Sequence, residues 1–191
     1  MDFFLKSKSW QVFILLVVLP FGVQGSVMSF LFSSEEIDPA IVFQVMPILM
    51  LVFMVVFIVW FWSLGVGINK RISKAIKPKV KLFKFCIIYS ALYMVVFQVF
   101  FQLTASGQSP SGAIAFIFPL HLVGMFSMFY ALYFVAKNIA TFEQNKAVKF
   151  SDFSGPFFLL WFFPIGIWVI QPRINQIYAN QEHNQQLQRT P

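Results

Sequence analysis

The chain has 191 residues, of which 59% are hydrophobic and only 11% charged, and its formal net charge is +7. A soluble domain carries about 25% charged residues, so this composition cannot cover a soluble globule with polar groups. The apolar residues also fall in long blocks instead of recurring at amphipathic spacing. These observations exclude an ordinary soluble domain and favour a chain that is embedded in lipid.

The apolar blocks predict membrane-spanning helices. A helix needs about 20 apolar residues to cross a hydrocarbon core of roughly 30 Å, because each residue rises about 1.5 Å. Four blocks reach that length and predict transmembrane helices at 10–32, 41–68, 83–103 and 113–136. Because lipid leaves exposed backbone without partners and the blocks lack strand-like alternation, the predicted fold class is an all-α polytopic bundle.

A fifth uncharged block, 153–170, is slightly short and contains Pro156 and Pro164. We expect it to span the bilayer as well, with a re-entrant segment as the alternative. The chain then divides into a transmembrane helical domain, 1–170, and a polar tail, 171–191. The tail is rich in Asn and Gln and has no apolar run long enough to build a core.

Basic residues alternate between the predicted connections and set the predicted orientation. Lys6 and Lys8 precede the first helix, and the connection between the second and third helices is the richest in basic residues. Lys and Arg mark cytoplasmic loops. We therefore expect the N-terminus in the cytoplasm and, with five spans, the C-terminus outside. A re-entrant fifth block would instead place Arg173 and Arg189 in the cytoplasm.

Seven basic residues lie in or beside that connection: Lys70, Arg71, Lys74, Lys77, Lys79, Lys81 and Lys84. We interpret the cluster as a topology determinant that contacts anionic lipid at the cytoplasmic face, at about 1 kcal/mol per basic residue. A specific docking site for lipid or protein is the alternative. No nucleic-acid-binding motif accompanies the cluster, so we expect no nucleic acid partner.

Residue groups that would support catalysis are missing from the predicted spans. The spans contain no Asp or Glu, and the two histidines are separated, with His121 in a span and His183 in the tail. Cys86 is the single cysteine, which excludes an internal disulfide and a C-x-x-C pair. We therefore predict no enzyme, no cofactor and no metal site. An enzyme would require an essential His121 together with a cofactor that the sequence gives no reason to expect.

Uncharged polar side chains within the spans concentrate in the predicted outer half. Counting about 1.5 Å per residue from the outer ends places Gln44 about 5 Å deep, Gln98 about 8 Å, and Gln24 and His121 about 12 Å. One interpretation is interhelical hydrogen bonding, which contributes under about 2 kcal/mol per contact. The other is a small cavity, open to the outer side, that admits a lipid head group or an apolar ligand. We expect Gln24 and His121 to approach each other or to share one cavity.

Small residues at helical spacing predict where helices pack closely. They form one face on the first predicted helix and one on the fourth, and we expect both faces to point inward: Gly22, Ser26 and Ser29, and Gly124, Ser127 and Ala131.

The stretch from Phe157 to Asn175 reads FFLLWFFPIGIWVIQPRIN. It resembles the C-terminal signature of small multi-pass bacterial membrane proteins that have no assigned function. The resemblance covers about a tenth of the chain and implies a location in the bacterial plasma membrane, with no implication for activity. A docking or fold-defining element is the favoured role for the positions carried over, which are Pro164, Gly166, Trp168, Gln171, Pro172, Arg173 and Asn175.

Together these features predict an integral membrane protein that acts through binding or assembly, as an accessory subunit of another membrane protein or as a homo-oligomer. The alternative is a small transporter or channel component that uses the polar cavity of the outer half.

Overall fold

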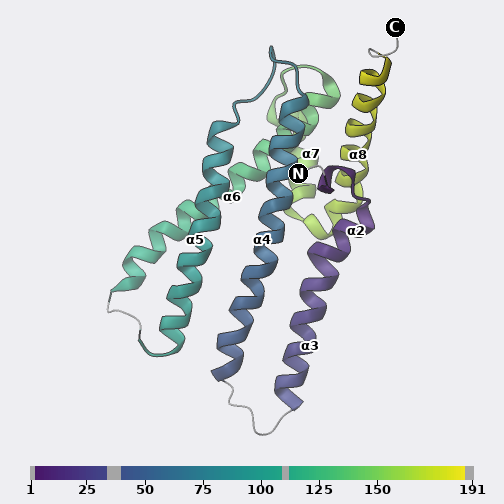
Figure 1. The fold of residues 1–191 in the computed structure, drawn as a ribbon. Coiled ribbons are helices and arrows are strands. Elements are labelled where there is room, and N and C mark those ends of the chain that lie inside the picture. Colours follow the sequence, from purple (N-terminus) through teal and green to yellow (C-terminus); the bar gives the residue numbers. More distant parts are fainter. Residues whose placement is uncertain (1–2, 34–39, 109–111, 188–191) are drawn as a thin grey trace.

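The computed structural model describes residues 3–33, 40–108 and 112–187 (Figure 1). Their regular structure is all helical, which confirms the predicted fold class. The elements in chain order are α1 (Phe3–Lys6), α2 (Ser9–Phe13), the π-helical η1 (Ile14–Val18), α3 (Leu19–Ser33), α4 (Ala40–Arg71), α5 (Lys81–Ala105), α6 (Ala113–Gln144), α7 (Phe150–Trp161) and α8 (Phe163–Leu187).

Four helical segments in the described residues are long and apolar enough to cross a membrane. They are Ser9–Ser33, which joins α2, η1 and α3, then Pro47–Arg71 in α4, Lys81–Ala105, and Ile114–Gln144 in α6. These segments correspond to the four predicted spans. The largest difference is at the end of α6, which continues to Gln144. The last residues of this helix are more polar, so the hydropathy of the sequence ended the predicted span before the helix itself ends.

The fifth apolar block does not form one straight helix. α7 ends at Trp161, Phe162 leaves the helical conformation with φ −90° and ψ 53°, and α8 runs back beside α7 (Figure 1). Pro164 lies in the first turn of α8, where a missing amide hydrogen costs no helical hydrogen bond. With 12 residues, α7 is about 18 Å long and covers only part of the hydrocarbon core. The hairpin of α7 and α8 favours the re-entrant alternative for this block over a straight fifth span.

The reversal at Phe162 returns the chain to the end where it began. Gln171 of α8 donates a hydrogen bond to the backbone oxygen of Phe4 over 2.6 Å. The ring of Tyr178 lies 4.8 Å from the Lys6 ammonium and 4.3 Å from the Arg71 guanidinium. The N-terminal segment, the end of α4 and the second half of α8 thus meet at one end of the bundle. The sides of the membrane on which the two termini lie stay a prediction that cysteine labelling can test.

We call this end the basic end and the opposite end the far end. Every Lys and Arg of the described residues lies in the basic half, in the connections or close to the helix ends that adjoin them. Arg173 of α8 lies beside the end of α6, where it pairs with Glu143, and thus near the other basic residues. The α4–α5 connection is at the top of Figure 1, together with the end of α8.

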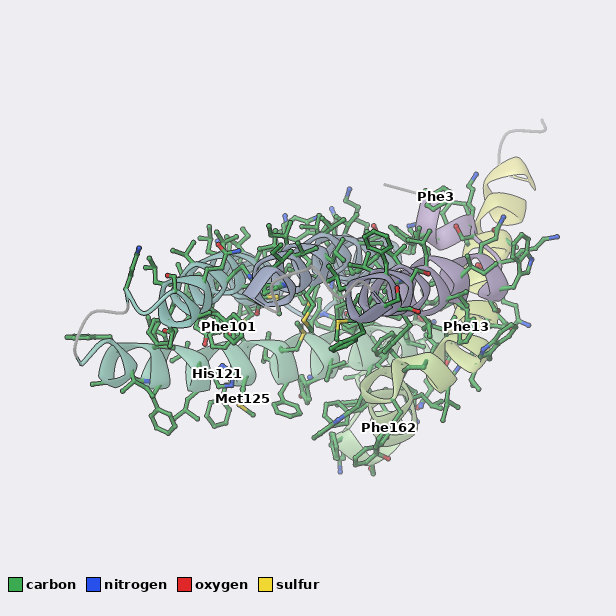
Figure 2. All side chains as sticks on the ribbon, turned by 90° about the horizontal axis from the view of Figure 1, so that it is seen from below. Phe3, Phe13, Phe101, His121, Met125 and Phe162 are labelled. Carbon is green, nitrogen blue, oxygen red and sulfur yellow. The ribbon has the colours of Figure 1, made fainter. Side chains whose placement is uncertain are left out.

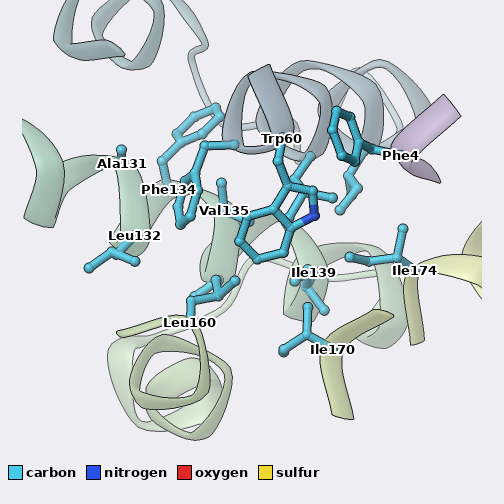
Figure 3. Packing of buried hydrophobic residues seen from close by; sticks show 14 of the residues in the cluster. Phe4, Trp60, Ala131, Leu132, Phe134, Val135, Ile139, Leu160, Ile170 and Ile174 are labelled. Atoms are coloured by element: carbon cyan, nitrogen blue, oxygen red, sulfur yellow. The ribbon is translucent and has the colours of Figure 1, made fainter. Parts of the chain in front are cut away.

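The bundle has two layers. α3, α4 and α5 stand side by side, and α6 crosses behind them at a steep tilt (Figures 1 and 2). Most of the buried core lies in the basic half, where Trp60 is completely buried among side chains from α6, α7 and α8, including Val135, Leu160 and Ile170 (Figure 3). In the far half the helices expose large apolar side chains such as Phe116, which suits contact with lipid.

The four-crossing arrangement predicts the outcome of cysteine labelling. In a Cys86→Ala background, single cysteines at Lys74, Lys146 and Gln176 should react with a membrane-impermeant maleimide from the same side, because these exposed positions belong to the basic end. A cysteine at Gln108 should react from the opposite side. Labelling after detergent permeabilisation controls for reactivity. Labelling of position 176 from the same side as position 108 would restore a fifth span.

Candidate functional site

A cavity of about 390 Å³ is lined by residues of η1, α3, α4, α5 and α6 and by the first residue of α8. Phe163, the first residue of α8, lines the cavity and packs edge-on against Phe57 with ring centroids 5.1 Å apart. The hairpin therefore forms one wall of this cavity, which we call the large cavity.

The lining of the large cavity is almost entirely apolar. It contains one amide, Gln24, besides aromatic and aliphatic side chains and four methionines, which are Met50, Met54, Met94 and Met128. Methionine is unbranched and polarisable, so methionine-rich surfaces adapt to apolar guests of different shapes. This lining can hold an apolar molecule and offers it one hydrogen-bonding side chain.

A second cavity of about 160 Å³ adjoins the large cavity, and Met94 and Met128 line both. We call it the small cavity. The Tyr93 hydroxyl is 2.8 Å from Nδ1 of His121 at this site. Gly124 permits the contact between α5 and α6, since a Cβ added there would come within 2.9 Å of the Tyr93 ring. Tyr93 and His121 therefore join α5 to α6 beside the small cavity.

The small cavity also contains a buried hydrogen-bonding atom that lacks a partner in the described residues. Ser90 lines it and is 3% exposed, and its Oγ has no hydrogen-bond partner among the described residues. His121 uses Nδ1 for the contact with Tyr93, which leaves Nε2 as its second polar atom. Ser90 is buried, whereas His121 is exposed at the surface of the bundle. Within a bilayer, the hydrocarbon around this surface supplies no bulk water.

The four polar residues predicted for the outer half are divided between different places. Gln24 lines the large cavity and His121 the small one, so they occupy adjoining cavities and are not hydrogen-bonded to each other. Gln98 lies one turn along α5 from Met94, and its buried Nε2 has no partner in the described part of the chain. Gln44 has a side chain outside the described residues.

The predicted cationic cluster lies at the basic end, far from both cavities. Lys70, Lys74, Lys79 and Lys81 are exposed, whereas Lys77 and Lys84 are half-buried. The Lys84 ammonium lies 5.8 Å from the ring of Trp62. Arg71 has a structural role: it donates a hydrogen bond to the Gly67 carbonyl oxygen over 2.7 Å, and its guanidinium lies over the ring of Tyr178. The exposed lysines of this set are available for contact with anionic head groups.

Two residues of the C-terminal signature hold the N-terminal segment. The Gln171 side-chain amide is completely buried and donates to the backbone oxygens of Phe4 and Ser7 over 2.6 and 2.9 Å. Asn175 donates to the Ser7 oxygen over 3.1 Å. The last carbonyl oxygens of a helix have no hydrogen-bond partner within it. The two amides therefore supply donors for the backbone oxygens at the end of α1.

The other signature residues shape the hairpin and attach it to the bundle. Gly166 lies where α8 crosses α7, and a Cβ there would overlap the backbone oxygen of Leu159. Arg173 forms two hydrogen bonds with Glu143 at the end of α6, of 2.8 and 2.5 Å. Trp168 is half exposed and packs against Phe13, and Pro172 is exposed within α8. These contacts favour the fold-defining role.

Sequence reasoning missed a second buried amide pair. Asn69 donates to the Pro78 oxygen over 2.9 Å and to Oδ1 of Asn138 over 3.3 Å, and Asn138 donates to the Gly65 oxygen over 3.1 Å. Both side chains lie just beyond the predicted ends of their spans, so neither was counted inside lipid. Ser90 and Tyr93 were also missed, although Tyr89 and Tyr93 stand one helical turn apart and mark a polar face on α5.

Four apolar helices and a half-length hairpin define the class: the chain is a multi-pass integral membrane protein. No protein-family model, curated protein or solved structure matches it. Within the described residues, no group of three or more His, Cys, Asp or Glu side chains is placed to hold a metal ion.

Proposed function

We propose that the protein is a non-enzymatic binding protein of the membrane that holds one apolar lipid chain in the large cavity. The observation that carries this proposal is the methionine-rich lining at hydrocarbon depth. Met54 lies about 10 Å inside the span that begins at Pro47. The volume of about 390 Å³ falls in the range of small-molecule sites, about 300 to 1,000 Å³.

One face of α5 offers a route from the far end to this cavity. Met94, Gln98 and Gln102 follow one another at intervals of four residues, which places them on one helical face. Gln102 lines a cavity of about 360 Å³ at the far end of α4 and α5, together with Ile48 and Ser106. This row of residues supports entry of the lipid chain into the large cavity from the far end. A transporter or channel for polar solutes has less support, since Gln24 is the one polar side chain in the large cavity's lining.

The proposal includes an orientation and a second contact with lipid. The positive-inside rule places the basic end, and with it both termini, in the cytoplasm. There the exposed lysines at positions 70, 74, 79 and 81 contact anionic head groups. The signature of residues 157–175 supports a bacterial plasma membrane. A protein that retains a lipid chain without acting on it suits an accessory or assembly role beside a partner membrane protein.

Photo-crosslinking in proteoliposomes tests the lipid-chain proposal. A phospholipid with a diazirine on its palmitoyl chain should label the peptides that line the large cavity. Met54→Trp should lower this labelling at least fivefold, because the larger ring fills the space that the chain would occupy. Met28→Trp on α3 is the matched control, since Met28 is not part of the lining. Equal labelling of both variants, each folded as judged by its elution profile, would contradict the proposal.

A further inference from the structure

We infer that the small cavity holds the polar end of the same ligand, and that this ligand is a neutral lipid whose head carries carbonyl groups, such as a prenylated quinone. This inference rests on the proposed function, because the apolar chain would occupy the large cavity. The two cavities adjoin through Met94 and Met128. A single molecule can therefore extend from one to the other by displacing flexible side chains.

The first argument is the unpaired hydroxyl of Ser90. Its Oγ is buried without a partner in the described residues, and the side chain lines the small cavity. Buried polar groups are hydrogen-bonded in most proteins, and an exception calls for a missing partner. A hydroxyl donates one hydrogen bond, so a carbonyl oxygen in the cavity would satisfy it.

The second argument is the fixed direction of His121. Its ring lies between those of Tyr93 and Phe97, with centroids 5.7 and 5.8 Å away. When the Tyr93 hydroxyl donates to Nδ1, the imidazole carries its hydrogen on Nε2 and becomes a donor. His121 lines the small cavity and is also exposed at the surface of the bundle. In this proposal its Nε2 hydrogen is the second donor to the ligand, beside the buried Ser90 hydroxyl.

The third argument is depth, which excludes a charged head. His121 lies about 12 Å along α6 from its start at Ala113, well inside a hydrocarbon core of about 30 Å. A phosphate group at this depth is costly unless a cation accompanies it. Every described Lys and Arg lies in the basic half, so none of them accompanies a head group here. The head must therefore be neutral, and two donors select one with carbonyl acceptors.

The experiment is competition against the photoreactive lipid by two soluble probes. Decylubiquinone carries carbonyls on its ring, whereas decylbenzene offers the same chain length without them. Decylubiquinone should compete at least tenfold better with the unmodified protein. In the Ser90→Ala, His121→Leu double variant this preference should disappear, while competition by decylbenzene stays unchanged. Ser63→Ala is the control, since Ser63 is also a buried helical serine but donates to the Val59 oxygen.

Three results would overturn the inference and leave the proposed function intact: equal competition by both probes, a preference that survives the double variant, or equal competition by a short-chain phosphatidylglycerol. Should the double variant not fold, His121→Phe keeps a ring between Tyr93 and Phe97 and must still lower the preference. Failure of the proposed function is distinguishable, because Met54→Trp would then leave crosslinking unchanged and neither probe would compete.

Discussion

Replacement of Gly166 by alanine is expected to lower the free energy of unfolding by about 3 kcal/mol or more. The added methyl group would overlap the backbone oxygen of Leu159, so it cannot be accommodated by turning a side chain. α7 and α8 must separate at their crossing, which also disturbs the contact of Phe163 with Phe57. The measurement is reversible unfolding in detergent micelles.

Gly155→Ala in α7 is the matched control. Apart from its chain neighbours, nothing lies within 4 Å of a Cβ at Gly155. Alanine in a helix interior is more stable than glycine by roughly 0.5 to 1 kcal/mol, and the following Pro156 offsets part of this gain because its ring crowds a Cβ on the residue before it. This variant should therefore differ from the original protein by no more than about 1 kcal/mol. If both variants had the same stability, the close crossing of α7 and α8 would be wrong.

Gln171→Leu should destabilise the protein by about 2 kcal/mol and loosen the N-terminal segment. The substitution leaves the Phe4 oxygen without the amide that pairs with it, and an unpaired buried acceptor costs about 1 to 3 kcal/mol. The Ser7 oxygen keeps its bond from Asn175. The substitution also removes Oε1 of Gln171, a buried atom without a partner in the described residues, and this offsets part of the loss of stability.

Two measurements check this expectation: the free energy of unfolding and the rate of limited proteolysis near Lys8. Gln176→Leu is the control, because Gln176 is exposed on the same helix. Both readouts should change for Gln171→Leu and neither for Gln176→Leu. Unchanged proteolysis of the Gln171 variant would show that the N-terminal segment is held by other contacts.

Hydropathy was sufficient for the four long helices because each block exceeds the length that a bilayer requires. The fifth block could not be resolved in this way. Its break at Phe162 is a change of backbone conformation that brings Gly166 against the Leu159 oxygen, and mean hydropathy contains no information on backbone conformation. Pro164 and the basic residue Arg173 were the signals for a reversal, and both were present in the sequence.

The candidate site shows a different limit. Counting residues placed Gln24 and His121 at a similar depth, but depth does not determine which way a helix faces. His121 pairs with Tyr93 on the neighbouring α5 instead. The small-residue faces did not show by themselves which of them is buried. Gly124 and Ser127 are buried as expected, whereas Gly22 is exposed and has nothing within 4 Å of a Cβ. Whether a small face is covered depends on the tilt of its neighbours.

The bond from Gln171 to Phe4 joins residues separated by 167 positions. At translation rates of about 5 to 20 residues per second, the start of the chain waits roughly 10 to 30 seconds for this partner to be made. Phe163, which lines the large cavity, is also made late. The N-terminal segment therefore docks, and the large cavity gains the wall that Phe163 forms, only after α8 has been made. A chain that ends before α8 would lack both the docked N-terminal segment and this wall of the cavity.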